Sequence, residues 1–299
     1  MKRGLLIYNP AAGAHLSPER MRGVIARAAA AGVELVERPT TEPGDATRIA
    51  ARALVDPPDL IAVAGGDGTI AEVGAAVVDT RVPIAILPYG TANVLAREYG
   101  IGANPVRAER VLASSRTRAL RAWRTDRRPC FLWMGVGLDA RMMATVQPML
   151  KRRFGRAGIG WTALGEFLNY AFPAIAIEGI GENGRPFAHE ATYAVAANIR
   201  RYGGDMMVAP AADPEDDLLD LVLFTGRTLP ALARFLIGVA LGEMERPHVP
   251  NVIRLRAREM NARPVRGDPV DVQIDGDVAG VTPASIGPVT GKIRILVPE

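Results

Sequence analysis

Residues 59–72, DLIAVAGGDGTIAE, decide the fold of this chain. The apolar run 60–64 combines small and β-branched residues, as in a strand buried on both faces. It breaks into the glycine-rich turn 65–69, after which apolar residues repeat at helical spacing over 70–77. A strand that passes through such a turn into a helix is a unit of an α/β fold, and its helix N-terminus presents backbone N–H groups.

The same turn predicts a phosphate-binding site. Glycines let a ligand approach the backbone, and the N–H groups of a helix N-terminus attract an anion. Asp67 would repel a phosphate unless a cation lay between them, so the turn predicts a nucleotide phosphate site served by Mg²⁺. An ordinary strand–turn–helix link uses the same residue types and is the alternative.

Composition indicates a globular protein of two domains. The chain has 299 residues, of which 48% are hydrophobic and 23% charged. Its single cysteine, Cys130, excludes an intrachain disulfide and favours a reducing compartment. The sequence shows no signal peptide, membrane-spanning stretch or zinc-ligand spacing, so we expect a cytoplasmic protein. An isoelectric point near 9.5 favours anionic partners.

Strands and helices alternate through the first half of the chain. Alternation of this kind predicts a parallel sheet flanked by helices, with ligands beyond the carboxyl ends of the strands. Three polar loops, 9–13, 65–69 and 88–93, each follow a predicted strand and should therefore converge. The predicted strands are 5–8, 33–36, 60–64 and 82–87.

From about residue 117 the pattern changes to short runs with β character, separated by turn residues. This pattern is typical of an antiparallel sandwich or barrel. The predicted strands are 119–123, 130–134, 174–177, 192–196, 218–224, 252–255, 270–274 and 292–297. Two helical segments interrupt them, and one of these, 229–241, is mainly apolar and is expected only to pack against the rest of the domain.

The other helical segment, 146–172, combines basic residues with large apolar and aromatic ones. Lys151, Arg152, Arg153 and Arg156 lie close to Phe154 and several other apolar side chains. A basic cluster beside such groups predicts transient docking on an anionic membrane surface. A core helix with a solvated, charged end is the alternative.

Two acidic loops and one glycine motif in the second half are ambiguous by themselves. Loop 213–217 is either a site for a hard cation or a solvated turn. Segment 273–277 either presents Asp277 as a base or forms a hairpin turn. Residues 135–140 match a dinucleotide-binding pattern but lack the strand–helix–strand context that this pattern requires.

Taken in order, the motifs resemble those of the diacylglycerol kinase catalytic family, which includes bacterial lipid kinases, sphingosine kinases and ceramide kinases. The resemblance runs from residue 9 to residue 277. The matching segments are NPAAG at 9–13, GGDGT at 65–69, LPYGTAN at 87–93, the acidic loop at Asp216 and IDGD at 274–277.

The resemblance implies an ATP- and Mg²⁺-dependent kinase that phosphorylates a lipid hydroxyl. It implies an α/β ATP-binding domain over residues 1–118 and a β-rich lipid-substrate domain over 119–299, with the site in the cleft between them. The last strand is expected to pack back near the first domain. The residues implied around ATP are Asn9, Thr40, Gly65, Gly66, Asp67, Gly68, Thr69, Ile70, Ala71, Glu72, Thr91 and Asn93.

By the same resemblance, Asp67 would organise the phosphates and the catalytic Mg²⁺, and Asp277 would accept the proton of the lipid hydroxyl. Asp216, with the carbonyl groups of Asp213 and Leu218, would hold a second, structural Mg²⁺. Three positions depart from the family pattern: Ala71 replaces an Asn, Val94 replaces an acidic residue, and Asp277 replaces a Glu.

The expected substrate is diacylglycerol, ceramide, a sphingoid base or a related membrane lipid. The expected partners are this lipid and an anionic membrane surface, touched peripherally; no nucleic acid is expected, and a homodimer is left open. The alternatives are an NAD kinase-like enzyme and a catalytically impaired module that binds lipid or nucleotide.

Overall fold

The computed structural model describes residues 1–12, 16–151 and 165–299, and it divides into two compact units. Unit 1 comprises Met1–Ala122, Gly203–Asp205 and Thr290–Glu299. Unit 2 comprises Trp123–Tyr202 and Met206–Val289. Unit 1 is therefore discontinuous in the sequence, because the chain leaves it and later re-enters it.

Unit 1 contains the predicted parallel sheet. Its strands are ordered β2-β1-β3-β4, and every neighbouring pair is parallel. The buried β3 lies inside this order, as its apolar sequence requires, whereas β2 is at the edge and exposes most of its residues. The bounds are β1 Lys2–Tyr8, β2 Val33–Pro39, β3 Leu60–Gly65 and β4 Ile84–Pro88.

The last strand of the chain, β16 (Ala284–Leu296), begins in unit 2 and ends in unit 1. Its Ile295 pairs in parallel with Ile84 of β4. Just beyond the strand, Val297 donates its N–H to the carbonyl of Arg116 at 3.0 Å, and its own carbonyl accepts from the Ser114 hydroxyl at 2.7 Å. The end of the chain is thus hydrogen-bonded into the first unit.

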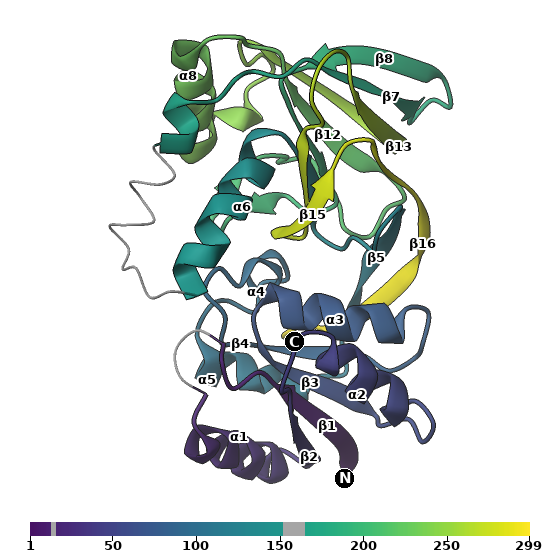
Figure 1. The fold of residues 1–299 in the computed structure, drawn as a ribbon. Coiled ribbons are helices and arrows are strands. Elements are labelled where there is room, and N and C mark those ends of the chain that lie inside the picture. Colours follow the sequence, from purple (N-terminus) through teal and green to yellow (C-terminus); the bar gives the residue numbers. More distant parts are fainter. Residues whose placement is uncertain (13–15, 152–164) are drawn as a thin grey trace. The chain divides into compact units, whose positions relative to one another are not determined.

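The helices of unit 1 form layers against its sheet. In Figure 1, α2 and α3 lie together on one face of this sheet, and α1 and α5 lie on the other. Helix α1 begins at Pro18, because the Ser17 side chain caps it by accepting from the Arg20 N–H and proline is favoured in the first turn. The bounds are α1 Pro18–Ala30, α2 Asp45–Ala53, α3 Asp67–Val77, α4 Val94–Glu98, α5 Pro105–Ala108 and the 3₁₀-helix η1 Glu109–Leu112.

Unit 2 is built on antiparallel strands, as predicted. The order is β15-β14-β6-β9-β12-β13, and β7 joins β13 to β8. One buried apolar cluster, with Trp123, Met134, Leu221 and Met260 among its members, fills the interior. Strand β5, Thr117–Thr125, runs from unit 1 into unit 2. The other bounds are β6 Trp133–Val136, β7 Ile175–Gly181, β8 Pro186–Ala191, β9 Tyr193–Ala197, β10 Arg201–Tyr202, β11 Met206–Met207, β12 Leu219–Phe224, β13 Val252–Pro264, β14 Asp271–Ile274 and β15 Asp277–Val281.

Several strands after residue 117 differ from the predictions: β13 and β16 are longer than expected, and β10, β11 and β15 were not among the predicted strands. The strand expected at 130–134 begins only at Trp133, because the backbone N–H groups of 131–133 point at the Asp275 carboxylate. Strand β8 was not anticipated; its alternating exposure is that of an edge strand with few apolar residues.

Helices α6 (Leu138–Lys151), α8 (Leu229–Ala240) and the 3₁₀-helix η2 (Glu243–Glu245) complete unit 2. Helix α8 packs as expected, with Phe235 stacked on Phe224 at a centroid distance of 5.1 Å. Of the predicted membrane-docking segment, the part that contains Arg152, Arg153 and Arg156 lies outside the described residues. Among the helices in the described ranges, none is both long and apolar enough to cross a bilayer.

Candidate active site

Three loops meet at the carboxyl edge of the parallel sheet. The strand register places Tyr8 beside Ala64 and Gly65 beside Pro88, so the segments that follow β1, β3 and β4 emerge together. A pocket of about 310 Å³ opens between them. Its lining residues are Asn9, Ala12, Gly66, Gly68, Thr69, Glu72, Gly90 and Thr91.

Close backbone contact between two of these loops requires glycine. A Cβ atom on Gly90 would lie 2.4 Å from the Cα of Gly66. The carbonyl of Gly65 accepts N–H bonds from Tyr89 and Gly90, each at 3.0 Å. Side chains at 66 or 90 would therefore separate the loops and widen the pocket.

Asp67 joins the glycine-rich turn to the start of α4. Its two carboxylate oxygens accept the backbone N–H groups of Val94 at 3.0 Å and Leu95 at 2.9 Å. Burial raises the pKa of Asp67, and these two hydrogen bonds oppose the rise. Asp67 is not among the residues that line the pocket, but each of its oxygens keeps a lone pair for a cation.

Of the residues predicted around ATP, six line the pocket: Asn9, Gly66, Gly68, Thr69, Glu72 and Thr91. Others shape it. The Asn93 side chain accepts the Gly90 N–H and donates to the Gly90 carbonyl, both at 2.9 Å, so it holds its own loop. Ile70 and Ala71 are buried, and Thr40 follows β2 without reaching the pocket lining.

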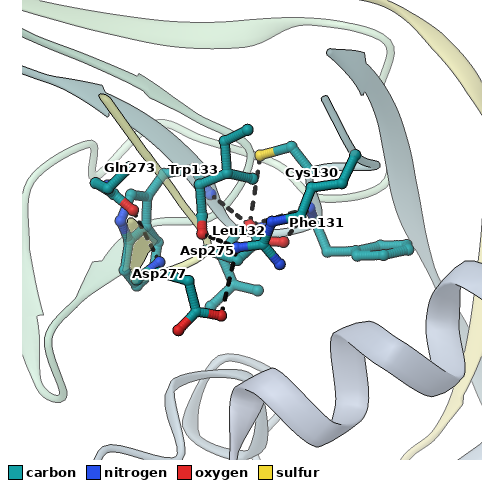
Figure 2. A network of polar contacts seen from close by, with 10 residues as sticks. Cys130, Phe131, Leu132, Trp133, Gln273, Asp275 and Asp277 are labelled. Atoms are coloured by element: carbon teal, nitrogen blue, oxygen red, sulfur yellow. Dashed lines mark hydrogen bonds and ion pairs between the residues drawn. The ribbon is translucent and has the colours of Figure 1, made fainter. Parts of the chain in front are cut away.

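In unit 2, Asp277 is the first residue of β15, immediately after a tight turn (Figure 2). Its side chain is 54% exposed, and its Oδ2 lies 3.4 Å from Nη2 of Arg128. The same Arg128 nitrogen donates to the carbonyl of Ile274. Asp277 is thus an accessible carboxylate with an arginine beside it, on a rigid hairpin.

The acidic loop that was predicted to hold a structural Mg²⁺ contacts an arginine. Oδ1 of Asp216 accepts the Leu218 N–H at 2.9 Å, and Oδ2 pairs with Nη2 of Arg256. The carbonyl of Asp213 accepts the Asp216 N–H at 3.3 Å. Over the described part of the chain, no group of three or more acidic, histidine or cysteine side chains is placed to hold a metal ion.

Arg256 neutralises this region. Its guanidinium lies 3.5 Å from Asp220 and 3.8 Å from Glu182, besides the Asp216 contact. In this arrangement both carboxylate oxygens of Asp216 have partners within the protein. The predicted ligand set of Asp213, Asp216 and Leu218 remains a prediction from the resemblance.

If Arg256 supplies the positive charge for this loop, removing divalent cations with a chelator should leave the melting temperature of the wild-type protein unchanged. Arg256→Ala should lower the unfolding free energy by about 2 kcal/mol, because three carboxylates lose the positive charge that they share. The effect is limited because the Arg256 side chain is partially exposed. Mg²⁺ should then stabilise the variant more than the wild type. Thermal melts with and without Mg²⁺ test this, and a chelator-sensitive wild type would contradict it.

Asp220 makes stability depend on pH. Burial raises its pKa to about 6, although Arg256 lowers it. The folded protein therefore retains this proton over a pH range in which the unfolded chain, with the ordinary value of 3.8, has released it. The resulting stabilisation is present below pH 3.8 and is lost as pH rises to about 6; it amounts to at most about 3 kcal/mol. Denaturant titrations should show that the unfolding free energy falls less between pH 4 and 6.5 for Asp220→Asn than for wild type. Equal decreases in the two proteins would refute the assignment.

A glycine-rich turn at the carboxyl edge of a parallel sheet, with a buried carboxylate behind it, is an arrangement suited to a phosphate-bearing ligand. Comparison with known proteins specifies the class of protein. The family model for the diacylglycerol kinase catalytic domain matches residues 3–124. The model for the YegS C-terminal NAD kinase β-sandwich-like domain matches residues 133–297. The chain belongs to the family of lipid kinases that share these two domains.

Relatives span nearly the whole chain. A diacylglycerol kinase of Mycobacterium tuberculosis is 28% identical, over 98% of this chain and 94% of its own length. A protein of Citrobacter koseri named "probable lipid kinase YegS-like" is 33% identical, over 76% of each chain. A crystal structure of a diacylglycerol kinase from Bacillus anthracis has the same fold, with a TM-score of 0.74 and 20% identity, covering 99% of this chain and 97% of that one.

Proposed function

We propose that this protein transfers the γ-phosphoryl group of ATP to a hydroxyl group of a membrane lipid, such as diacylglycerol, ceramide, a sphingoid base or a related lipid. One observation carries the proposal. Six residues that the family resemblance assigns to ATP line one pocket, although they come from three separate segments of the chain. The names of the relatives support a lipid as the acceptor.

In this proposal the pocket binds the phosphates of ATP. The backbone N–H groups at the N-terminus of α3 and the polar side chains of Asn9, Thr69 and Thr91 would donate hydrogen bonds to phosphate oxygens. Asp67 would hold Mg²⁺ through its remaining lone pairs, and this ion would supply charge neutralisation for the phosphates. Asp67 also keeps the turn attached to α4, so it orients the donors as well.

Asp277 would act as the general base. The oxygen of the lipid hydroxyl bonds to the γ-phosphorus, and the bond between that phosphorus and the β,γ-bridging oxygen breaks. The Asp277 carboxylate takes the hydroxyl proton, and the products are ADP and a lipid phosphate. The exposed side chain of Asp277 suits this role, because a base must reach the attacking oxygen within hydrogen-bond distance.

Purified protein, [γ-³²P]ATP and Mg²⁺ should label a lipid in a panel of diacylglycerol, ceramide and sphingoid bases presented in mixed vesicles. NAD is the parallel acceptor in the same assay. Labelled NADP with no labelled lipid would overturn the proposal in favour of an NAD kinase. Binding of ATP or vesicles without any transfer would identify an impaired binding module.

We also propose peripheral contact with an anionic membrane through the basic segment that begins at Lys151. Neutralising Lys151, Arg152 and Arg153 together should weaken binding to anionic vesicles in sedimentation assays. The effect should be larger at low salt, because exposed charges are screened at high ionic strength. Unchanged binding would favour the alternative, a helix that packs in the core.

A further inference from the structure

The turn that carries Asp277 has an unusual backbone. Asp275 has φ = 51° and Gly276 has φ = 83°, so two successive residues adopt left-handed conformations between the paired residues Ile274 and Asp277. This is the geometry of a two-residue hairpin turn, and it costs energy at the non-glycine position. Contacts from outside the turn can offset that cost and fix the direction in which Asp277 leaves it.

The Asp275 side chain supplies the first contact (Figure 2). Its carboxylate is buried and accepts the backbone N–H groups of Phe131, Leu132 and Trp133, at 3.0, 2.7 and 3.3 Å. The Cys130 thiol lies 3.4 Å from the same carboxylate. Asp275 therefore anchors the turn to the segment that precedes β6.

Gln273 supplies the second contact, and it joins the turn to a buried carboxylate. Its side chain is fully buried; Oε1 accepts the Gly276 N–H at 2.8 Å, and Nε2 donates to Oδ2 of Asp139 at 2.9 Å. Because the Gly276 N–H can only donate, Oε1 must face it, and Nε2 therefore faces Asp139. Tyr202 donates its hydroxyl to the same oxygen of Asp139 and adds to its support.

This arrangement also explains the glycine motif at 135–140, which the nucleotide pocket does not use. A Cβ atom on Gly135 would lie 2.0 Å from Oδ2 of Asp139, so glycine is required for the carboxylate to reach Gln273. Gly137 has φ = 108°, and a Cβ there would lie 2.5 Å from the Tyr170 hydroxyl. The glycines of this motif therefore make room for Asp139 at the start of α6, and this packing role accounts for them without a bound dinucleotide.

We propose that Gln273 is a positioning residue: by bridging Asp139 and the Gly276 N–H, it fixes the turn from which Asp277 acts on the acceptor. The proposal rests on the proposed function for the role of Asp277. Loss of the bridge should change the placement of the base without changing the nucleotide pocket, which belongs to unit 1.

The test compares Gln273→Leu with a matched control, Thr282→Val. Thr282 is also buried in the β14–β15 hairpin, where its hydroxyl accepts the Val270 N–H at 2.9 Å, away from the turn. Gln273→Leu should lower kcat for lipid phosphorylation about 10- to 100-fold with little change in KM for ATP, as expected for a misplaced catalytic group. It should also speed hydrogen exchange at the Gly276 amide, and the control should do neither.

A second variant keeps the test decisive if Gln273→Leu does not fold. Gln273→Met has about the length of glutamine but makes neither hydrogen bond, so its exchange rate and kcat should change in the same direction as those of Gln273→Leu. Unchanged Gly276 exchange in a folded variant, or faster exchange with wild-type kcat, would overturn the proposal. A wild-type protein that phosphorylates no lipid would refute the proposed function, and exchange at Gly276 would still decide whether Gln273 holds the turn.

Discussion

Replacing Asp277 with Asn should lower lipid phosphorylation by about two to four orders of magnitude, the range expected when a general base is removed. The amide cannot take the proton of the attacking hydroxyl. ATP affinity should be unchanged, because the nucleotide pocket is formed by other residues. The unfolding free energy should change little, since the side chain is more than half exposed and its arginine contact is long. Initial rates with labelled ATP and calorimetry of ATP binding measure both effects.

Two further variants make this prediction specific. Asp277→Glu restores the residue that the family pattern has at this position and should retain substantial activity. Asp268→Asn removes an exposed carboxylate of the same unit that has no proposed role, and its activity should equal that of wild type. Wild-type turnover in Asp277→Asn would exclude Asp277 from the chemistry.

Asp67→Asn should abolish measurable turnover and also weaken ATP binding, which separates its effect from that of Asp277. Both carboxylate oxygens accept backbone N–H groups at the start of α4, and an amide offers an oxygen to only one of them. The unpaired N–H should cost about 1–3 kcal/mol of unfolding free energy. The loss of negative charge should also remove the proposed support for Mg²⁺. Calorimetric titration with Mg²⁺–ATP and thermal melts are the measurements.

Asp79→Asn is the matched control for this variant. Asp79 also uses its carboxylate to accept a backbone N–H in unit 1, that of Lys292 at 3.0 Å, but it does not line the pocket. The amide oxygen of the substituted side chain can keep this hydrogen bond, so the substitution removes the charge and should change neither stability nor ATP affinity appreciably. Equal ATP affinities for wild type and Asp67→Asn would show that Asp67 has only a structural role.

The elements of unit 1 could be predicted because their signals are local. The apolar run of β3, the Ser17–Pro18 start of α1 and the loops after β1, β3 and β4 are each encoded within a few neighbouring residues. Parallel pairing then brings the ends of those strands to one edge. For this reason the loops that contain Asn9, Thr69 and Thr91 could be expected to converge, whereas the assignment of these residues to ATP came from the family resemblance.

The hydrogen bonds and ion pairs that hold the site residues in place could not be predicted in the same way, because they join residues far apart in the chain. Arg256 meets Asp216 across 40 residues, Gln273 meets Asp139 across 134, and Arg128 meets Asp277 across 149. The residues that neighbour an arginine or a glutamine in the sequence do not indicate which distant residue it contacts. The glycine pattern at 135–140 was a visible signal, but it suggested a ligand and not the carboxylate that it accommodates.

Strand β16 has a consequence for how the protein is made. The sheet that carries the nucleotide pocket takes a parallel strand from Thr290–Glu299, so β4 keeps an unpaired edge until these residues have been synthesised. Most of unit 1 is therefore synthesised well before the strand that completes its sheet, contrary to the usual order in which an N-terminal domain folds as it emerges. For the same reason, a fragment that ends at residue 122 lacks the strand that pairs with β4, and a fusion that transfers the nucleotide-binding part to another protein must include residues 290–299.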